Sequence, residues 1–202
     1  PLIFQFIISL ATWLLFFIFI ESRGQMAKAI SNTMRNVFGL GGVFIWAFAG
    51  TCNNMVSNLI GQRKFDSVLL AVKRINLWST GISLLIVVLL NIFPGIFFSV
   101  FGQGSVFSEE GIPVIRVVSM GMLLMSVSNI WLNAVTGTGR TSMNLMIEIA
   151  AIASYLVYTL YFMKWHYVSL SVAWTNEIVY WGVIGLISFT YMSSGRWMRE
   201  RK

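Results

Sequence analysis

Long apolar stretches separated by short polar breaks run through the whole 202-residue chain. An α-helix rises about 1.5 Å per residue, so crossing a hydrocarbon layer about 30 Å thick takes roughly 20 residues. The pattern therefore predicts six membrane-spanning helices. Their expected ranges are 2–22, 30–60, 68–100, 112–137, 142–163 and 169–193. The second and third exceed one straight crossing, and we expect the third to bend at Pro94 and Gly95.

The polar breaks contain turn-forming residues, and none of them is long enough to form a separate domain. We therefore predict a single all-α integral membrane lobe of six transmembrane helices over residues 1–202, with any chemistry placed among the helices. The chain opens directly on an apolar stretch, without an initiator methionine or a basic leader. We interpret it as a fragment whose upstream sequence is missing.

Composition agrees with a membrane protein, because 57% of the residues are hydrophobic and only 10% are charged. A soluble domain of this size would need a more charged exterior. The net charge of +7 comes from basic residues confined to short segments, which indicates membrane topology and no nucleic-acid partner. Cys52 is the only cysteine, so neither a disulfide framework nor a cysteine metal site is expected.

Basic residues divide unevenly between the two ends of the predicted bundle. An even number of spans returns both chain ends to one side, and that side carries Arg63, Lys64, Lys73, Arg74, Arg140, Arg196, Arg199, Arg201 and Lys202. The opposite side carries Arg23, Lys28, Arg35, Arg116 and Lys164. Nine basic residues against five predict that the first side is cytoplasmic, the C-terminus included. We expect a bacterial inner membrane as the location.

The segment AVTGTGRTS, residues 134–142, resembles the end of a phosphate-binding loop. That motif requires a glycine and a lysine where this chain has Ala134 and Arg140, and it joins a strand to a helix. Here both flanks are predicted membrane helices, so no nucleotide partner is expected. Gly137 and Gly139 instead allow a tight turn between antiparallel helices.

Polar residues inside the predicted spans are the candidates for function. Five asparagines, together with several glycines and alanines, lie in the second span: Asn32, Asn36, Asn53, Asn54 and Asn58. They indicate either close helix packing or the wall of a polar cavity. Trp13 lies in the middle of the first span, where it packs against core or lipid, or lines a cavity for a flat or cationic ligand.

Two carboxylates lie more than one helical turn inside predicted spans, where an ionised group costs on the order of 3 kcal/mol or more. Glu177 lies at a depth similar to that of Arg116 and Arg35, so a structural ion pair is one interpretation, with a cavity site as the other. Glu148 has no cation at its depth and is the candidate for handling a proton or a cation. The spacing shows no catalytic constellation, so we expect no enzyme, no cofactor and no metal site.

Four local matches, in a shared order, resemble the multidrug and toxic compound extrusion (MATE) family of transporters. They are P…Q…W…FF…IE..G from Pro1 to Gly24, NNMVSNLIGQRK at the end of the second span, IPVIRVVS at the start of the fourth, and LNAVTGTGRTSMN after it. The resemblance covers nearly the whole chain. It implies a twelve-helix transporter of two six-helix lobes, of which this chain is the second, exchanging Na⁺ or H⁺ for small organic compounds, mainly cations.

The resemblance carries over the family's coupling residues only in part. In one sodium-coupled branch, acidic residues occupy the positions that an ungapped comparison assigns to Ser9 and Met125. Because neither acid is present here, ion coupling either resides in the upstream six-helix lobe or uses Glu148 in this one.

The resulting prediction is a cation-coupled antiporter that exports drugs or toxic organic compounds by alternating access. Its candidate cavity residues are Gln5, Trp13, Asn54, Asn58, Asn129, Asn133, Glu148 and Tyr155. The expected partners are the organic substrates, membrane lipid and the upstream lobe. Two alternatives stay open: a flippase for lipid-linked oligosaccharides, whose cavity should be rich in cations, and a membrane assembly module without transport.

Overall fold

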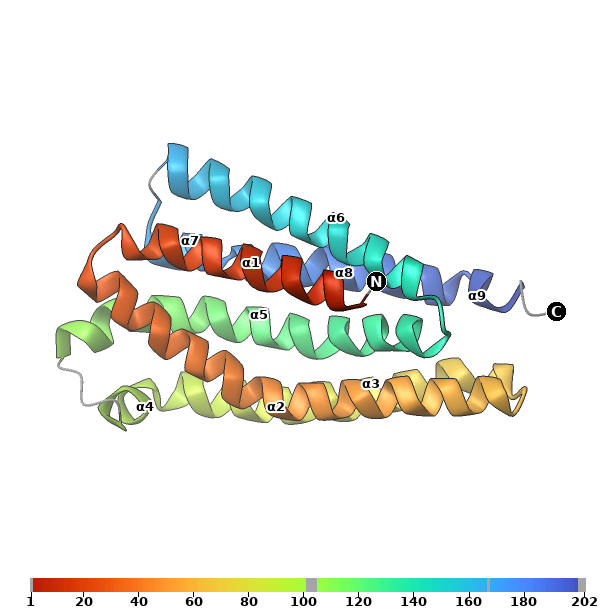
Figure 1. The fold of residues 1–202 in the computed structure, drawn as a ribbon. Helices are drawn as coiled ribbons and strands as arrows, with labels where there is room; N and C mark the ends of the chain where they lie inside the picture. The colour runs from red at the N-terminus through yellow and green to blue at the C-terminus, as the bar shows by residue number, and fades with distance from the viewer. Residues whose placement is uncertain (1, 101–104, 167, 200–202) are drawn as a thin grey trace.

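A computed structural model describes the backbone of residues 2–100, 105–166 and 168–199, and side chains over 7–99, 106–164, 166 and 168–198. Within these ranges the regular structure is entirely helical (Figure 1). The helices are α1 (Leu2–Glu21), α2 (Gln25–Gly61), α3 (Phe65–Ile92), α4 (Pro94–Val100), α5 (Ser105–Gly137), α6 (Thr141–Thr159), α7 (Leu170–Trp174), α8 (Asn176–Ser193) and α9 (Arg196–Arg199). A π-helical turn, η1 (Leu160–Trp165), extends α6.

The helix bounds differ from the sequence-based ranges at several places. α5 begins at Ser105, seven residues before its predicted start at residue 112, and the predicted span 169–193 is interrupted at Thr175, between α7 and α8. α2 begins at Gln25, five residues before its predicted start at residue 30. The predicted span 68–100 is two helices, because α3 ends at Ile92 and α4 begins at Pro94. Proline has no backbone N–H and is tolerated in the first turn of a helix, so it separates the two segments at the expected position.

Four segments within the described residues are long and apolar enough to cross a membrane: Phe65–Ile92, Val106–Gly137, Thr141–Lys164 and Leu170–Ser193. The described part of α1, Ile7–Glu21, is apolar but shorter. α2, with 37 residues, is the longest helix in the described part of the chain, and its asparagines lower its mean hydropathy. The chain is therefore an all-α integral membrane protein. The other two of the six predicted spans, which correspond to α1 and α2, are not identified by length and hydropathy within the described residues.

α5 occupies the centre of the bundle. It packs against α2 and α3 on one side and α8 on another, while α6 packs against α8 and α1. In the apolar window of α5, 56% of residues are buried, against 17% in α3. The outer face of α3 exposes Leu77 and Trp78, as expected for a surface in contact with lipid. The core therefore lies around α5.

Two glycines allow helices to approach α5 closely. A Cβ at Gly137 would lie 2.7 Å from the carbonyl oxygen of Asn53 in α2, and a Cβ at Gly185 in α8 would collide with Ser128. Small residues at such contacts are the usual basis of close helix packing in membranes. Nearby, the thiol of buried Cys52 donates to the carbonyl oxygen of Ile130 at 3.5 Å, which also joins α2 to α5.

The turn between α5 and α6 lies at the same end of the bundle as the α2–α3 turn and α9 (Figure 1). It joins two helices, and Gly139 has a positive φ of 79°, which glycine adopts without strain. Because no strand precedes the glycines, this segment lacks the context of a phosphate-binding loop. The turn serves to reverse the chain.

Candidate functional site

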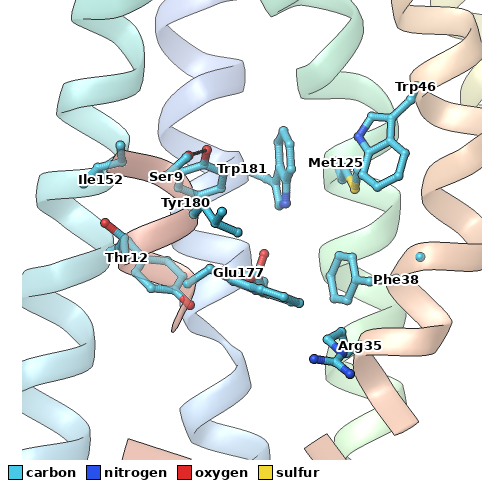
Figure 2. A pocket seen from close by; sticks show the side chains of 14 residues that line it. Ser9, Thr12, Arg35, Phe38, Trp46, Met125, Ile152, Glu177, Tyr180 and Trp181 are labelled. Carbon is cyan, nitrogen blue, oxygen red and sulfur yellow. Dashed lines mark hydrogen bonds between the residues drawn. The ribbon is translucent and has the colours of Figure 1, made fainter. Parts of the chain in front are cut away.

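A cavity of about 490 Å³ lies among α1, α2, α5, α6 and α8 (Figure 2). Its lining is mostly aromatic and apolar, with a few polar groups: Ser9, Leu10, Thr12, Trp13, Arg35, Phe38, Gly39, Trp46, Met125, Ile152, Tyr155, Glu177, Tyr180 and Trp181. Cavities of roughly 300–1,000 Å³ with a few convergent polar groups are typical of small-molecule sites. It is therefore the candidate functional site of this chain.

Helical periodicity explains which residues reach the cavity. Residues three and four apart share a helix face, so Ser9, Thr12 and Trp13 line the cavity together from α1. The same spacing brings Glu177, Tyr180 and Trp181 together from α8. The sequence-based list contained Trp13 but missed Tyr180 and Trp181, although the spacing from Glu177 could have indicated both.

Glu177 is the acidic residue in the cavity lining. Its side chain is only 6% exposed, and its Oε1 has no hydrogen-bond partner among the described residues. The indoles of Trp13 and Trp181 are its polar neighbours, and Figure 2 shows the indole nitrogen of Trp181 directed toward the Glu177 carboxyl group. A buried carboxylate with one unpartnered oxygen, in a cavity lined by aromatic rings, is an environment that attracts a cation.

The predicted ion pair of Glu177 with Arg35 or Arg116 does not form. Arg35 lies on the α2 side of the cavity, and its guanidinium carbon is 5.8 Å from the centre of the Phe17 ring. Arg116 lies on an exposed face of α5. Similar depth in the membrane was the only basis for the pairing, and helix rotation places the three side chains apart. Within the described residues the salt bridge joins Lys28 to Glu21.

Glu148 lies directly behind the cavity wall. It is 4% exposed, and Ser9 Oγ donates a hydrogen bond of 2.6 Å to its Oε1. The Tyr180 hydroxyl donates to the same oxygen, and the Ser9 and Tyr180 oxygens are 3.1 Å apart. Because Ser9 and Tyr180 themselves line the cavity, Glu148 is connected to it through hydroxyl groups. Glu148 therefore belongs to the site without lining the cavity.

The other residues that were predicted to line a cavity form two groups, one in the cavity lining and one outside it. Tyr155 lines the cavity, as Trp13 does. Asn54 and Asn58 are exposed and lie two or more turns beyond Trp46 on α2, outside the cavity. Asn129 is buried and accepts a hydrogen bond of 2.9 Å from Asn133, so these two asparagines pair with each other on α5. All four asparagines lie outside this cavity, because polarity alone does not determine which helix face a residue occupies, and their role in transport stays a prediction. The side chain of Gln5 lies outside the described residues.

Comparison with known proteins identifies the family. The family model MatE matches residues 1–162. The chain belongs to the MatE family. A search of curated proteins gives no match. A solved structure, described as the outward-facing conformation of a multidrug resistance MATE family transporter of the MOP superfamily, is similar with a TM-score of 0.81 and 17% identity.

The structural match covers 93% of this chain and 42% of that transporter. The chain therefore spans less than half the length of the MATE transporter that it matches, and the share agrees with the prediction of a single lobe. At 17% identity the likeness concerns the fold. It shows that the helix arrangement described above is that of a MATE transporter.

Within this MatE family chain, both positions that lack the expected acids line the cavity: Ser9 and Met125. Carboxylates reach the same region from other helices. Glu148 in α6 accepts a hydrogen bond from Ser9. Glu177 in α8 lies beside α5 one turn from Met125, because a Cβ at Gly121 would be 3.3 Å from the Glu177 Cβ. The region therefore contains two carboxylates despite the two missing acids.

Proposed function

We propose that the chain forms the second six-helix lobe of a cation-coupled antiporter that exports toxic organic compounds, mainly cations, by alternating access. The observation that carries this proposal is the buried carboxylate of Glu177, unpartnered at Oε1, in a cavity lined by aromatic rings. The proposed location is the bacterial inner membrane, with α9 and the C-terminus on the cytoplasmic side. The role is transport and not catalysis.

The cavity has the chemistry to hold a flat organic cation. Its positive charge meets the Glu177 carboxylate, and its ring system lies against the indoles of Trp13 and Trp181. Each cation–π contact contributes about 0.5–2 kcal/mol, the larger value applying where water is excluded. Apolar residues make up much of the remaining wall, so ligands of different outline can be accommodated. Broad specificity for aromatic cations follows from this combination.

Coupling requires that the driving ion and the substrate compete. A proton on Glu177 neutralises the negative charge of its carboxylate, and a Na⁺ ion bound to the carboxylate pairs with that charge. Either ion therefore weakens binding of the organic cation. Glu148 provides a second carboxylate behind the wall, linked to the cavity by Ser9 and Tyr180. In a transporter with two access states, this competition links inward ion movement to outward substrate movement.

The lining gives no support to the flippase alternative. A pyrophosphate-linked substrate requires several cations, and Arg35 is the cation among the described lining residues, with its guanidinium over the Phe17 ring. An assembly module without transport would give a buried carboxylate no function, since packing favours satisfied polar groups.

The test is export of ethidium by the full-length transporter in cells that lack other efflux pumps. We expect Glu177→Gln to slow efflux at least tenfold at equal expression, because the amide removes the charge that attracts the dye. Glu109→Gln is the matched control, since Glu109 is exposed on α5 outside the cavity, and it should leave efflux unchanged. Efflux at the wild-type rate in Glu177→Gln would contradict the proposal.

A further inference from the structure

Two adjacent cations, Lys73 and Arg74, are exposed in the third turn of α3, a helix long and apolar enough to cross a membrane. The salt bridge within the described residues joins Lys28 to Glu21, so neither cation has an ion-pair partner there. Asp66, an exposed acid in the first turn of α3, is about 10 Å or more away along the helix axis. Because an unpaired cation is costly in hydrocarbon, the two residues mark the level at which α3 leaves the lipid interior.

The remainder of α3 has the length and the chemistry of a membrane crossing that begins at these cations. Residues 75–92 contain no charged side chain. At about 1.5 Å per residue they extend roughly 27 Å, close to a hydrocarbon layer about 30 Å thick. Leu77 and Trp78 are 72% and 68% exposed, and each lies one turn after a cation on the same face of the helix. An indole next to a cation is typical of the boundary between headgroups and acyl chains.

The packing of α2 against α5 places the boundary at the same level. A Cβ at Gly137, the last residue of α5, would lie 2.7 Å from the carbonyl oxygen of Asn53, so α5 ends at the level of Asn53. α2 continues for about 12 Å beyond this level to Gly61. Figure 1 shows the α2–α3 turn reaching past the α5–α6 turn. Because α3 runs back from its own turn, Lys73 lies near the level of Asn53, where α5 ends.

The two cations point away from the protein interior. α3 packs against α2 and α5 through its buried residues, among them Val72, Ile75 and Ser79. Ser79 donates a hydrogen bond of 3.1 Å to the carbonyl oxygen of Ser126 in α5, which fixes the rotation of α3. The opposite face carries the cations, followed by exposed apolar side chains. Cations at one end of an apolar face complement a lipid, which is anionic at one end and apolar along the rest.

We propose that Lys73 and Arg74 bind the phosphate of an anionic phospholipid, phosphatidylglycerol, whose acyl chains lie along Leu77 and Trp78. A guanidinium group donates two parallel N–H bonds to a phosphate, and an ammonium group adds a further charge-assisted donor. Two positive charges favour a lipid with net negative charge over zwitterionic phosphatidylcholine. Neither cation lines the cavity, so this lipid site is separate from the proposed substrate site.

The test is native mass spectrometry of the purified full-length transporter, titrated in detergent with dioleoyl phosphatidylglycerol or dioleoyl phosphatidylcholine. We expect the wild type to bind phosphatidylglycerol at least tenfold more tightly than phosphatidylcholine. The double variant Lys73→Gln, Arg74→Gln should lose one tightly bound phosphatidylglycerol molecule per transporter. The exchange Lys73→Arg, Arg74→Lys keeps both charges and should retain that molecule. Thermal unfolding midpoints verify that each variant is folded.

The double variant Arg63→Gln, Lys64→Gln is the matched control, because it removes two exposed charges from the α2–α3 turn, beyond the lipid boundary. It should keep the wild-type number of bound lipids. Equal losses in the two double variants would overturn the site, since binding would then follow net charge and not position. An undiminished number in the Lys73→Gln, Arg74→Gln variant would also overturn it and would indicate that the upstream lobe covers this face. Equal affinity of the wild type for both lipids would contradict the proposed headgroup.

Discussion

Tyr180 donates a hydrogen bond to Glu148 across the interface of α6 and α8, three residues after Glu177 on its own helix. One tyrosine therefore touches one buried carboxylate and lies one helical turn from the other. Ser9 donates to the same Glu148 oxygen at 2.6 Å from α1. Three helices around the cavity are thus joined at a single carboxylate.

Removing either donor to Glu148 should weaken this junction. We expect Tyr180→Phe and Ser9→Ala each to lower the free energy of unfolding by about 1.5–3 kcal/mol, the range for hydrogen bonds to charged groups. The two effects should be non-additive, with a coupling energy of about 0.5–3 kcal/mol in a double-mutant cycle, since both donors share one acceptor. Thermal unfolding of the purified transporter measures both. Strict additivity would show that the two donors act independently.

Glu148→Gln tests whether the second carboxylate functions in transport. We expect ethidium efflux to fall at least tenfold while expression and folding persist, because the amide cannot carry the charge that, under the proposed function, interacts with the driving ion. Glu110→Gln changes the same chemical group at an exposed α5 position and should leave ethidium efflux unchanged. An assembly module without transport predicts no difference between the two variants, so a selective loss in Glu148→Gln excludes it.

The aromatic wall should determine dye affinity. We expect Trp181→Ala and Trp13→Ala each to raise the Kd for ethidium severalfold, in line with about 0.5–2 kcal/mol per cation–π contact. Trp78→Ala removes an indole that is 68% exposed on the outer face of α3, and it should leave the Kd unchanged. Equilibrium dye binding to the purified transporter gives the values. Equal effects of all three substitutions would assign the change to general destabilisation.

Close packing of α8 on α5 predicts a steric effect at Gly185. We expect Gly185→Ala to cost about 1–3 kcal/mol of stability, because the new methyl group collides with Ser128. Gly81→Ala in α3 meets no atom within 4 Å and should instead be neutral or stabilising by about 0.5–1 kcal/mol. Ser128→Ala should relieve part of the Gly185→Ala cost by removing the hydroxyl. A cost unchanged in the double variant would place the strain elsewhere.

Features that depend on residues close in the chain were predictable from the sequence. The helix break before Pro94 follows from the missing backbone N–H, and the reversal at Gly139 follows from its freedom to adopt a positive φ. The all-α membrane class follows from the length and spacing of the apolar stretches. These properties need no knowledge of how one helix packs on another.

The site was predicted less well because it depends on helix rotation. Trp13 and Tyr155 line the cavity as expected, whereas Asn54 and Asn58 are polar residues on other faces. An ion pair was one of the two interpretations of Glu177 and rested on depth alone, although partners must also face each other. The contact of Ser9 with Glu148 joins residues 139 positions apart, and only the packing of α1 on α6 brings them together.

Cys52 gives this lobe a practical advantage for measuring motion. Its side chain is fully buried between α2 and α5, and buried thiols react slowly with labelling reagents. A cysteine introduced at an exposed position would therefore be the reactive thiol of the lobe, without replacing the native residue. Pairs of spin labels or fluorophores placed at the exposed ends of α3 and α6 could then report whether distances change in the way that the proposed alternating-access mechanism requires.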